Sequence, residues 1–307
     1  MRKTFIDTLA DIARQDKDIF LLTGDLGFSV FEDFQKEFPD RFINCGVMEQ
    51  SMVSIAAGLA LSGKKPYVYS IIPFATMRPF EQIRNDVCYQ NLNVKIIGVG
   101  AGFAYGGLGS THWAIEDIAI LRSLPNITIM SPADATETKA LTLQSYQKPG
   151  PAYIRLLKPE KHVVPEGVAT VLSEPSVIQK GRDGVIITTG ACLEIGIAVA
   201  QKMENHGKHL TVISLHTLKP IDQEKLVAEL AGQEIIFTIE EHRISGGLGS
   251  IVAQLLASHS LAIPLQSFGV DDSCEPITGH QDYLAAHYGI DTESIYKKIL
   301  QHYGNTK

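Results

Sequence analysis

The sequence predicts an α/β protein with two domains, each a mostly parallel sheet flanked by helices. The chain has 307 residues, which is too long for one ordinary α/β layer and fits two domains of about 150 residues each. Short β-branched runs alternate with amphipathic stretches, and this alternation is typical of parallel strands joined by helical crossovers. The pattern stops between residues 158 and 175, where three prolines and no clear period indicate a linker. We therefore expect a first domain at residues 1–160, a linker at 161–176 and a second domain at 177–307.

Each half contains runs of strand length between longer helical patterns. In the first half the expected strands are residues 19–23, 42–44, 67–71, 94–99, 127–130 and 152–156, and the expected helices are 4–15, 50–62, 79–89 and 136–147. In the second half the expected strands are residues 184–189, 210–214, 235–239 and 265–268, and the expected helices are 194–206, 223–230, 248–259 and 292–301. Both halves therefore predict helices that cover a parallel sheet.

Composition and charge exclude several classes of function. Hydrophobic residues make up 45% and charged residues 20% of the chain, the balance of a soluble globular protein. The net charge is −7 and no basic run occurs, so no nucleic-acid partner is expected. No apolar stretch is long enough for a bilayer and the first residues lack the apolar core of a signal peptide, so no membrane association is expected. The four cysteines lie far apart without metal-ligand spacing, which favours free thiols in the cytoplasm and no metal site: Cys45, Cys88, Cys192 and Cys274.

Two glycine-rich stretches depart from the regular pattern. Residues 99–111 lead directly into His112, and a loop rich in glycine lets a ligand approach the backbone closely. Residues 242–250 precede an expected helix, where helix–strand packing explains glycine more often than anion binding does. Glu240, Glu241 and His242 are consecutive. Because adjacent residues on a strand point to opposite faces, we interpret these three as interface or surface residues rather than metal ligands.

Several segments resemble the transketolase family. The first-half motifs are Gly-Asp-Leu at 24–26, Val-Met-Glu-Gln at 47–50, Ala-Ala-Gly-Leu-Ala at 56–60 with a glycine at 63, Ser-Thr-His at 110–112, Leu-Pro-Asn at 124–126 and Ser-Pro-Ala-Asp at 131–134. The second-half motifs are Thr-Gly at 189–190, Glu-Glu-His at 240–242 and Gly-Gly at 246–247. They follow the family's order over nearly the whole chain. The resemblance implies a pyrimidine-binding domain for thiamine diphosphate followed by a transketolase C-terminal domain.

The resemblance also implies a partner chain. Transketolases hold the cofactor's diphosphate through Mg²⁺ with a Gly-Asp-Gly stretch, which does not occur in this sequence. The chain is therefore expected to be the C-terminal subunit of a split transketolase that shares thiamine diphosphate across an interface. An N-terminal transketolase subunit would bind the diphosphate and Mg²⁺, and self-association would give a heterotetramer, with the second domain contributing to the interface.

Five positions are expected to meet the cofactor. The resemblance places Glu49 at N1′ of the aminopyrimidine ring, with which the family's glutamate shares a proton, and an apolar pocket helps a carboxyl to keep a proton. Phe74 resembles the aromatic residue that stacks on this ring, and Ile71 and Ile72 are expected to line the same pocket. Asp25 resembles the aspartate near the thiazolium ring, although a turn residue at a strand end is an equal alternative.

A second group is expected to meet the substrate. His112 resembles the histidine that hydrogen-bonds the donor's oxygens or relays a proton. Arg2, Ser29 and Arg155 each fall where transketolases place an anchor for the sugar phosphate, and an arginine can hold phosphate oxygens in pairs. Arg155 also ends an expected strand, where ligands of α/β proteins usually bind.

Two positions depart from the family pattern. Counting back from His112, Gly100 falls where transketolases keep a histidine, and Leu108 falls where they keep an aspartate that reads a sugar hydroxyl. Loss of such groups changes discrimination between substrates, which weakens the expectation of ordinary pentose phosphates.

The main hypothesis is transfer of a two-carbon ketol unit between sugar phosphates and aldehydes, and three alternatives remain open. The chain could instead be the beta subunit of a 2-oxoacid dehydrogenase decarboxylase component, although Arg2 and Arg155 argue against it. It could be a deoxyxylulose phosphate synthase-like subunit, although that enzyme is usually one long chain. A regulatory or scaffold subunit with a decayed site is the non-enzymatic alternative, and Glu49, Phe74 and His112 argue against it.

Overall fold

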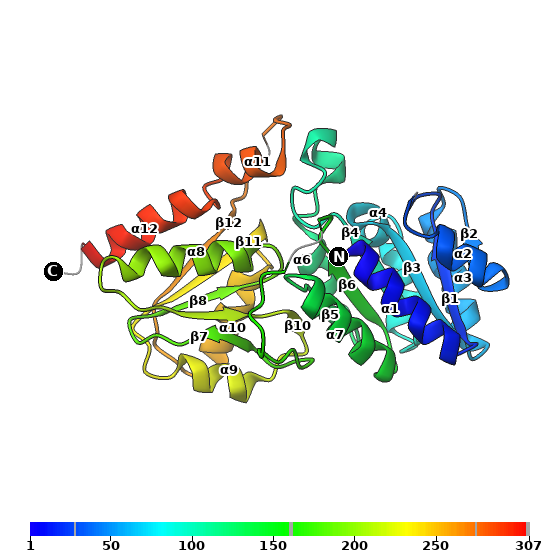
Figure 1. The fold of residues 1–307 in the computed structure, drawn as a ribbon, viewed down its shortest axis with the longest axis horizontal. Coiled ribbons are helices and arrows are strands. Elements are labelled where there is room, and N and C mark those ends of the chain that lie inside the picture. Colours follow the sequence, from blue (N-terminus) through cyan, green and yellow to red (C-terminus); the bar gives the residue numbers. More distant parts are fainter. Residues whose placement is uncertain (28, 160–161, 274, 305–307) are drawn as a thin grey trace.

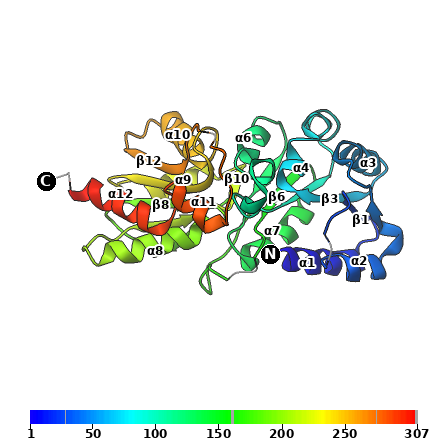
Figure 2. The same cartoon turned by 90° about the horizontal axis from the view of Figure 1, so that it is seen from above.

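The computed structural model describes residues 1–27, 29–159, 162–273 and 275–304. The predicted domain boundary at residues 160 and 161, the cysteine at 274 and the end of the predicted second domain at 305–307 lie outside the described residues. Two α/β halves lie side by side, one carrying the N-terminus and the other the C-terminus (Figures 1 and 2). Each half is built on a mostly parallel sheet flanked by helices, so the predicted fold class is confirmed.

The first sheet has seven strands in the order β10-β5-β6-β4-β3-β1-β2. Six of them come from the first half, pair in parallel and lie where the sequence predicted strands: β1 (Ile19–Thr23), β2 (Phe42–Asn44), β3 (Lys65–Ile71), β4 (Lys95–Val99), β5 (Thr128–Met130) and β6 (Ala152–Leu156). The seventh, β10 (Thr217–Lys219), comes from the second half and pairs antiparallel with β5. The second half therefore extends the first sheet.

Helices cover both faces of the first sheet. On one face, α1 (Arg2–Gln15) packs beside α7 (Ala135–Gln147) through buried side chains such as Phe5, Leu9 and Leu141. The other face is covered by the helices of a second cluster, chiefly α3 (Glu49–Leu61), the π-helical segment η2 (Ile83–Cys88) and α6 (Asp117–Arg122). Short pieces complete this half: α2 (Glu32–Glu37), η1 (Pro39–Arg41), α4 (Ile72–Thr76), α5 (Phe80–Gln82), η3 (Gly106–Leu108) and η4 (Ser110–His112). The helix predicted at 79–89 is thus divided between α5 and η2.

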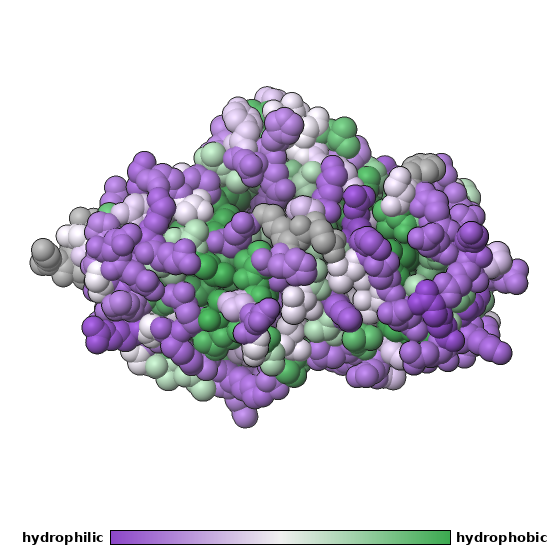
Figure 3. All heavy atoms as spheres, viewed as in Figure 1, coloured by the Kyte–Doolittle hydropathy of each residue, from purple (hydrophilic) through white to green (hydrophobic). Residues whose placement is uncertain are grey.

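The second sheet has five strands in the order β12-β11-β8-β9-β7. Its strands are β7 (Ser176–Gln179), β8 (Val185–Thr188), β9 (Thr211–Ser214), β11 (Ile236–Arg243) and β12 (Leu265–Val270), and only the edge pair β7–β9 is antiparallel. Its helices are α8 (Cys192–Glu204), α9 (Gln223–Leu230), α10 (Leu248–Ser258), α11 (Gln281–His287) and α12 (Thr292–Gly304). Helices α8 and α12 pack on one face and α9 and α10 on the other. The face of the molecule in Figure 3 is mostly hydrophilic, with apolar residues gathered in a few patches.

The strand β11 carries two buried acidic groups, of which one stabilises its own half and the other contacts the first half. The sequence analysis interpreted Glu240, Glu241 and His242 as interface or surface residues, and a surface position is wrong, since they are 0%, 7% and 0% exposed. Glu240 accepts hydrogen bonds from the backbone amides of Leu248 (2.6 Å) and Gly249 at the start of α10, and burial raises its pKa to about 8. This carboxylate satisfies the free amides that every helix N-terminus presents.

Glu241 reaches in the other direction, to the glycine-rich loop of the first half. Its Oε1 accepts from the backbone amide of Phe103 at 2.9 Å, and the Gln281 side-chain amide donates to its Oε2 at 2.7 Å. The Phe103 ring stacks on Tyr288 with centroids 5.4 Å apart. The second half therefore holds the loop that leads to His112.

Gly102 makes this contact possible, because it has φ +61° and a Cβ there would lie 2.4 Å from Cδ of Glu241. We expect Gly102→Ala to destabilise the protein by about 1–3 kcal/mol through strain and crowding. Thermal unfolding of the variant and of Gly63→Ala, which shares a positive φ but has open space around it, checks this. If the two variants lose the same free energy of unfolding, crowding against Glu241 does not contribute to the loss.

Candidate active site

Glu49 occupies the first position of α3 with its side chain only 3% exposed. The Arg78 guanidinium donates from Nη1 to both of its carboxylate oxygens, at 3.2 and 3.1 Å. The Ser70 hydroxyl lies 3.5 Å from Oε1, at the outer limit of a hydrogen bond. The predicted catalytic group is thus a buried carboxyl group at a helix N-terminus, held there by the Arg78 guanidinium.

Arg78 also contacts the predicted stacking residue. Its guanidinium carbon lies 3.8 Å from the centroid of the Phe74 ring. One planar group that bears N–H bonds therefore stacks on Phe74 and hydrogen-bonds Glu49 at the same time. An aminopyrimidine ring has the same two properties, a flat face and nitrogen atoms at its edge. The pair Glu49 and Phe74 therefore fits the ring of thiamine diphosphate.

The two isoleucines have different surroundings. Ile71, the last residue of β3, is half-buried at the margin of the core cluster that α1 covers. Ile72 is 0% exposed, and a Cβ at Gly98 would lie 2.6 Å from its Cγ1. Ile72 therefore packs against β4 in the core, whereas Ile71 has an accessible surface that can line a pocket.

His112 is brought to the same aromatic group. Its ring centroid lies 5.0 Å from that of Phe74 in an edge-to-face arrangement, and 6.5 Å from that of Tyr105. Its Nδ1 is 3.0 Å from the Thr111 hydroxyl. The imidazole is half-buried at the end of η4. The structure therefore places His112 beside the ring that would stack on the cofactor.

Asp25 follows β1 on the loop next to Glu49. Its backbone has φ +56°, an uncommon conformation for a residue other than glycine. The Asn44 side chain holds it on both sides: Oδ1 accepts from the Asp25 amide and Nδ2 donates to Asp25 Oδ1, each at 3.0 Å. The neighbouring Gly24 lies close to Glu49, since a Cβ there would be 3.6 Å from Oε1. The carboxylate of Asp25 is therefore exposed and fixed near the predicted catalytic group.

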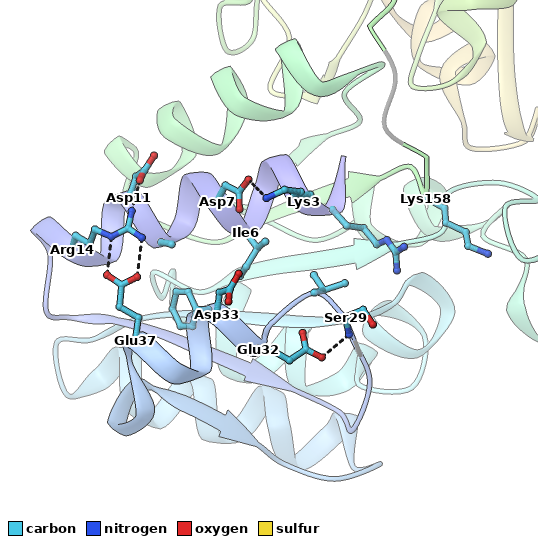
Figure 4. Close-up of a pocket in the computed structure, with 14 residues that line it drawn as sticks. Lys3, Ile6, Asp7, Asp11, Arg14, Ser29, Glu32, Asp33, Glu37 and Lys158 are labelled. Carbon is cyan, nitrogen blue, oxygen red and sulfur yellow. Dashed lines mark hydrogen bonds and ion pairs between the residues drawn. The ribbon is translucent and has the colours of Figure 1, made fainter.

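Arg2 and Ser29 line one cavity of about 650 Å³ beside α1 and α2. Lys158, which follows β6, lines it as well. Ser29 and Lys158 lie at one end of the cavity, and the Arg14–Glu37 ion pair lies at the other (Figure 4). Lys158 also stands over the Tyr105 ring, with Nζ 5.0 Å from the centroid. The sequence reasoning missed Lys158, although its position just after a parallel strand, as with Arg155, was the available signal.

Arg155 has partners other than the predicted phosphate. Its side chain is 3% exposed and donates from Nε to Asp117 Oδ2 at 2.9 Å. Its Nη2 donates to the carbonyl oxygens of Ala114 (2.6 Å) and Glu241 (3.1 Å). The side chain is thus used at the junction of the two halves, and Lys158 is the cation after β6 that faces the cavity. Because successive side chains of an extended segment point to opposite sides, Arg155 and Lys158 face different surroundings although they are close in sequence.

Comparison with known proteins decides the family. Residues 1–162 match the family described as transketolase, pyrimidine binding domain, and residues 174–295 match transketolase, C-terminal domain. The chain belongs to the transketolase family. It is 38% identical to one of the subunits of apulose-4-phosphate transketolase from Phocaeicola vulgatus, over 98% of this chain and 96% of that protein. It is 33% identical to a 6-deoxy-6-sulfo-D-fructose transketolase subunit of a Clostridium species over 96% of this chain and 92% of that protein.

Solved structures agree with this assignment to the transketolase family. A structure described as split gene transketolase, inactive beta4 tetramer, superimposes with a TM-score of 0.88 at 34% identity, and the match covers 98% of this chain and 97% of that one. Transketolase from Campylobacter jejuni shares the fold with a TM-score of 0.81, but the match covers only 46% of that longer chain. The chain therefore has the domains and length of the C-terminal subunit of split transketolases, as predicted.

Among the described residues, no group of three or more His, Cys, Asp or Glu side chains could hold a metal ion. Within the same residues, no helix combines the length and the apolar character needed to cross a membrane.

Proposed function

We propose that this chain is the C-terminal subunit of a split, thiamine-diphosphate-dependent transketolase. The enzyme transfers a two-carbon ketol unit between sugar phosphate donors and aldehyde acceptors. The observation that carries the proposal is one unbroken series of contacts. It runs from Glu49 through Arg78 to Phe74, from Phe74 to His112 and Tyr105, and ends at Lys158 on the cavity. This series joins a site for the cofactor ring to the end of the cavity that Lys158 lines.

Three residues of the series, Glu49, Phe74 and His112, have a task in ketol transfer. When bound, thiamine diphosphate supplies the carbon nucleophile. Glu49 would hold a proton at the ring nitrogen, and Phe74 would fix the plane of the ring. The Arg78 guanidinium, which lies over Phe74 in this structure, would have to leave that face of the ring. His112 donates to or accepts from the oxygens of the donor sugar. Asp25, exposed beside Glu49, lies where a carboxylate can face the positive ring of the cofactor.

The cavity would hold the far end of the sugar. Arg2 and Lys158 supply positive charge and Ser29 a hydroxyl, which together suit a phosphate group. Binding energy from such a remote group helps to orient the reacting end of the substrate. Ile71 completes the apolar wall between the two ends, and Arg155 supports the junction behind them.

The proposal requires a second chain. Without a Gly-Asp-Gly stretch, this chain depends on an N-terminal transketolase subunit to bind the diphosphate and Mg²⁺, in a heterotetramer. The relative described as an inactive beta4 tetramer supports both self-association and the need for a partner. We also propose the domain bounds 1–160 and 177–307 with a linker between them, and a cytoplasmic location, which the free buried cysteines Cys45, Cys88 and Cys192 favour.

A test combines the chain with its candidate partner. With thiamine diphosphate and Mg²⁺ present, we expect the pair to transfer ketol units and each of the two chains alone to be inactive. Pyruvate with glyceraldehyde 3-phosphate tests the deoxyxylulose phosphate synthase alternative, since one such enzyme is 33% identical to the chain, which covers 48% of that enzyme's length. Pyruvate with a lipoyl domain tests the 2-oxoacid dehydrogenase alternative. Binding of the partner without turnover of any substrate would support a regulatory subunit instead.

Substitution of Lys158 tests whether this residue, rather than Arg155, binds the phosphate group of the donor. We expect Lys158→Ala to raise KM for a phosphorylated donor about 10-fold or more, because a charged hydrogen bond contributes roughly 1.5–3 kcal/mol. The kcat with hydroxypyruvate, which has no phosphate, should stay the same. Lys17→Ala, an exposed lysine on the loop after α1, is the control. An unchanged KM in Lys158→Ala would remove this residue from the phosphate site.

A further inference from the structure

Tyr105 occupies the centre of the glycine-rich loop and fills the space beside Gly100. A Cβ at Gly100 would lie 2.2 Å from Cε2 and 2.3 Å from Cδ2 of the Tyr105 ring. Gly100 has φ +90°, a backbone conformation that side chains rarely allow. Position 100 therefore carries no side chain, and the phenol ring of Tyr105 occupies the space that one would fill.

The ring lies between the two ends of the proposed site. The Tyr105 ring is near both of them: its centroid lies 6.5 Å from that of the His112 ring and 5.0 Å from the Lys158 ammonium. Burial raises the pKa of the phenol, and Arg2 is near enough to oppose this with a smaller, lowering effect. The phenol is therefore neutral at physiological pH and able both to donate and to accept a hydrogen bond.

The hydroxyl group is available for a ligand. Tyr105 is half-buried, and none of the hydrogen bonds found among the described residues involves its hydroxyl. Gly100 and Leu108 bring no hydrogen-bonding side chain to this loop, and Leu108 is 59% exposed. Tyr105 is thus the polar side chain that lies between His112 and the basic end of the cavity.

We propose that Tyr105 is a specificity-determining residue that reads the hydroxyl groups in the middle of the sugar chain. This inference rests on the proposed ketol transfer. A sugar phosphate with its carbonyl near His112 and its phosphate at Arg2, Ser29 and Lys158 has to pass along the phenol. The ring face then covers the C–H groups of the sugar, and the hydroxyl bonds a sugar hydroxyl. A site built for such a bond rejects substrates that lack the partner group.

The experiment compares two donors in the complex with the partner chain. Fructose 6-phosphate has hydroxyl groups between its carbonyl and its phosphate, whereas hydroxypyruvate has none beyond the reacting carbons. We expect Tyr105→Phe to lower kcat/KM for fructose 6-phosphate about 10-fold, as loss of one hydrogen bond implies, and to leave hydroxypyruvate unchanged. Tyr105→Leu should lower the first value further, again with little effect on the second. Tyr89→Phe is the matched control, because Tyr89 also carries a cation over its ring (Arg84, 4.5 Å) but is 53% exposed.

Each outcome decides a separate point. Equal losses with both donors in Tyr105→Phe would assign the phenol to general support of the loop, and no loss with either would show that no sugar hydroxyl is read. A wild-type complex that uses hydroxypyruvate but not the sugar phosphate would also overturn the assignment of Tyr105 while leaving ketol transfer intact. A complex inactive with both donors, despite bound cofactor, would overturn the proposed function and this inference with it.

Discussion

Replacing Glu49 with glutamine is expected to lower ketol transfer roughly 100- to 10,000-fold, the range that a positioned acid or base contributes. Glutamine keeps the shape and one acceptor oxygen of the side chain but cannot exchange a proton with the ring nitrogen of the cofactor. The measurement is kcat with hydroxypyruvate in the complex with the partner chain. Because hydroxypyruvate has no phosphate group, its turnover reports on the reacting centre without a contribution from the phosphate site.

The fold should tolerate Glu49→Gln. The partner of Glu49 is Arg78, whose side chain is 46% exposed and can turn towards water. An ion pair with one partly exposed partner contributes about 1 kcal/mol or less, so the melting temperature should move by only a few degrees. Glu81→Gln, an exposed glutamate of α5, is the control for loss of one negative charge. Full activity in Glu49→Gln would exclude the glutamate from catalysis.

Strands were predicted correctly where the hydrophobic pattern and the length of a segment indicate a strand. The six strands of the first half and the four parallel strands of the second were all predicted, because most of them are largely buried apolar runs. The strands that were missed, β7 and β10, are short edge strands that pair antiparallel. Their partners are distant in sequence, and a segment as short as Thr217–Lys219 has no period to detect.

The candidate site shows the same limit. Glu49, Phe74 and His112 come together in the structure although they lie on different elements, and Arg2 shares a cavity with Ser29. Their meeting follows from the order of parallel strands, which places the segments after β1, β2, β3 and β4 at one edge of the sheet. Sequence position could not separate Arg155 from Lys158, nor reveal that Tyr105 fills the space next to Gly100. Both facts depend on the direction in which a side chain points, and the packing of the surrounding residues sets that direction.

The second substitution with a large expected effect is at Asp117, which forms a buried ion pair with Arg155. Asp117 is 0% exposed, and its Oδ2 accepts from Arg155 Nε at 2.9 Å and from the Tyr153 hydroxyl at 2.7 Å. Removing one member of a buried pair leaves the other charge without compensation and costs about 3–5 kcal/mol. We expect Asp117→Ala to lower the melting temperature of the isolated chain by roughly 10 °C, since each kcal/mol shifts a domain of this size by about 2–4 °C.

The double variant Asp117→Leu/Arg155→Met tests whether this loss arises from an uncompensated charge. Because it removes both charges and fills the space with apolar groups, it should recover most of the stability that either single variant loses. It also separates the two roles considered for Arg155. If Arg155 only supports the junction of the two halves, the double variant binds a phosphorylated donor with an unchanged KM, whereas Lys158→Ala does not. A stable double variant with a strongly raised KM would instead return Arg155 to the phosphate site, because no loss of fold could then explain the weaker binding.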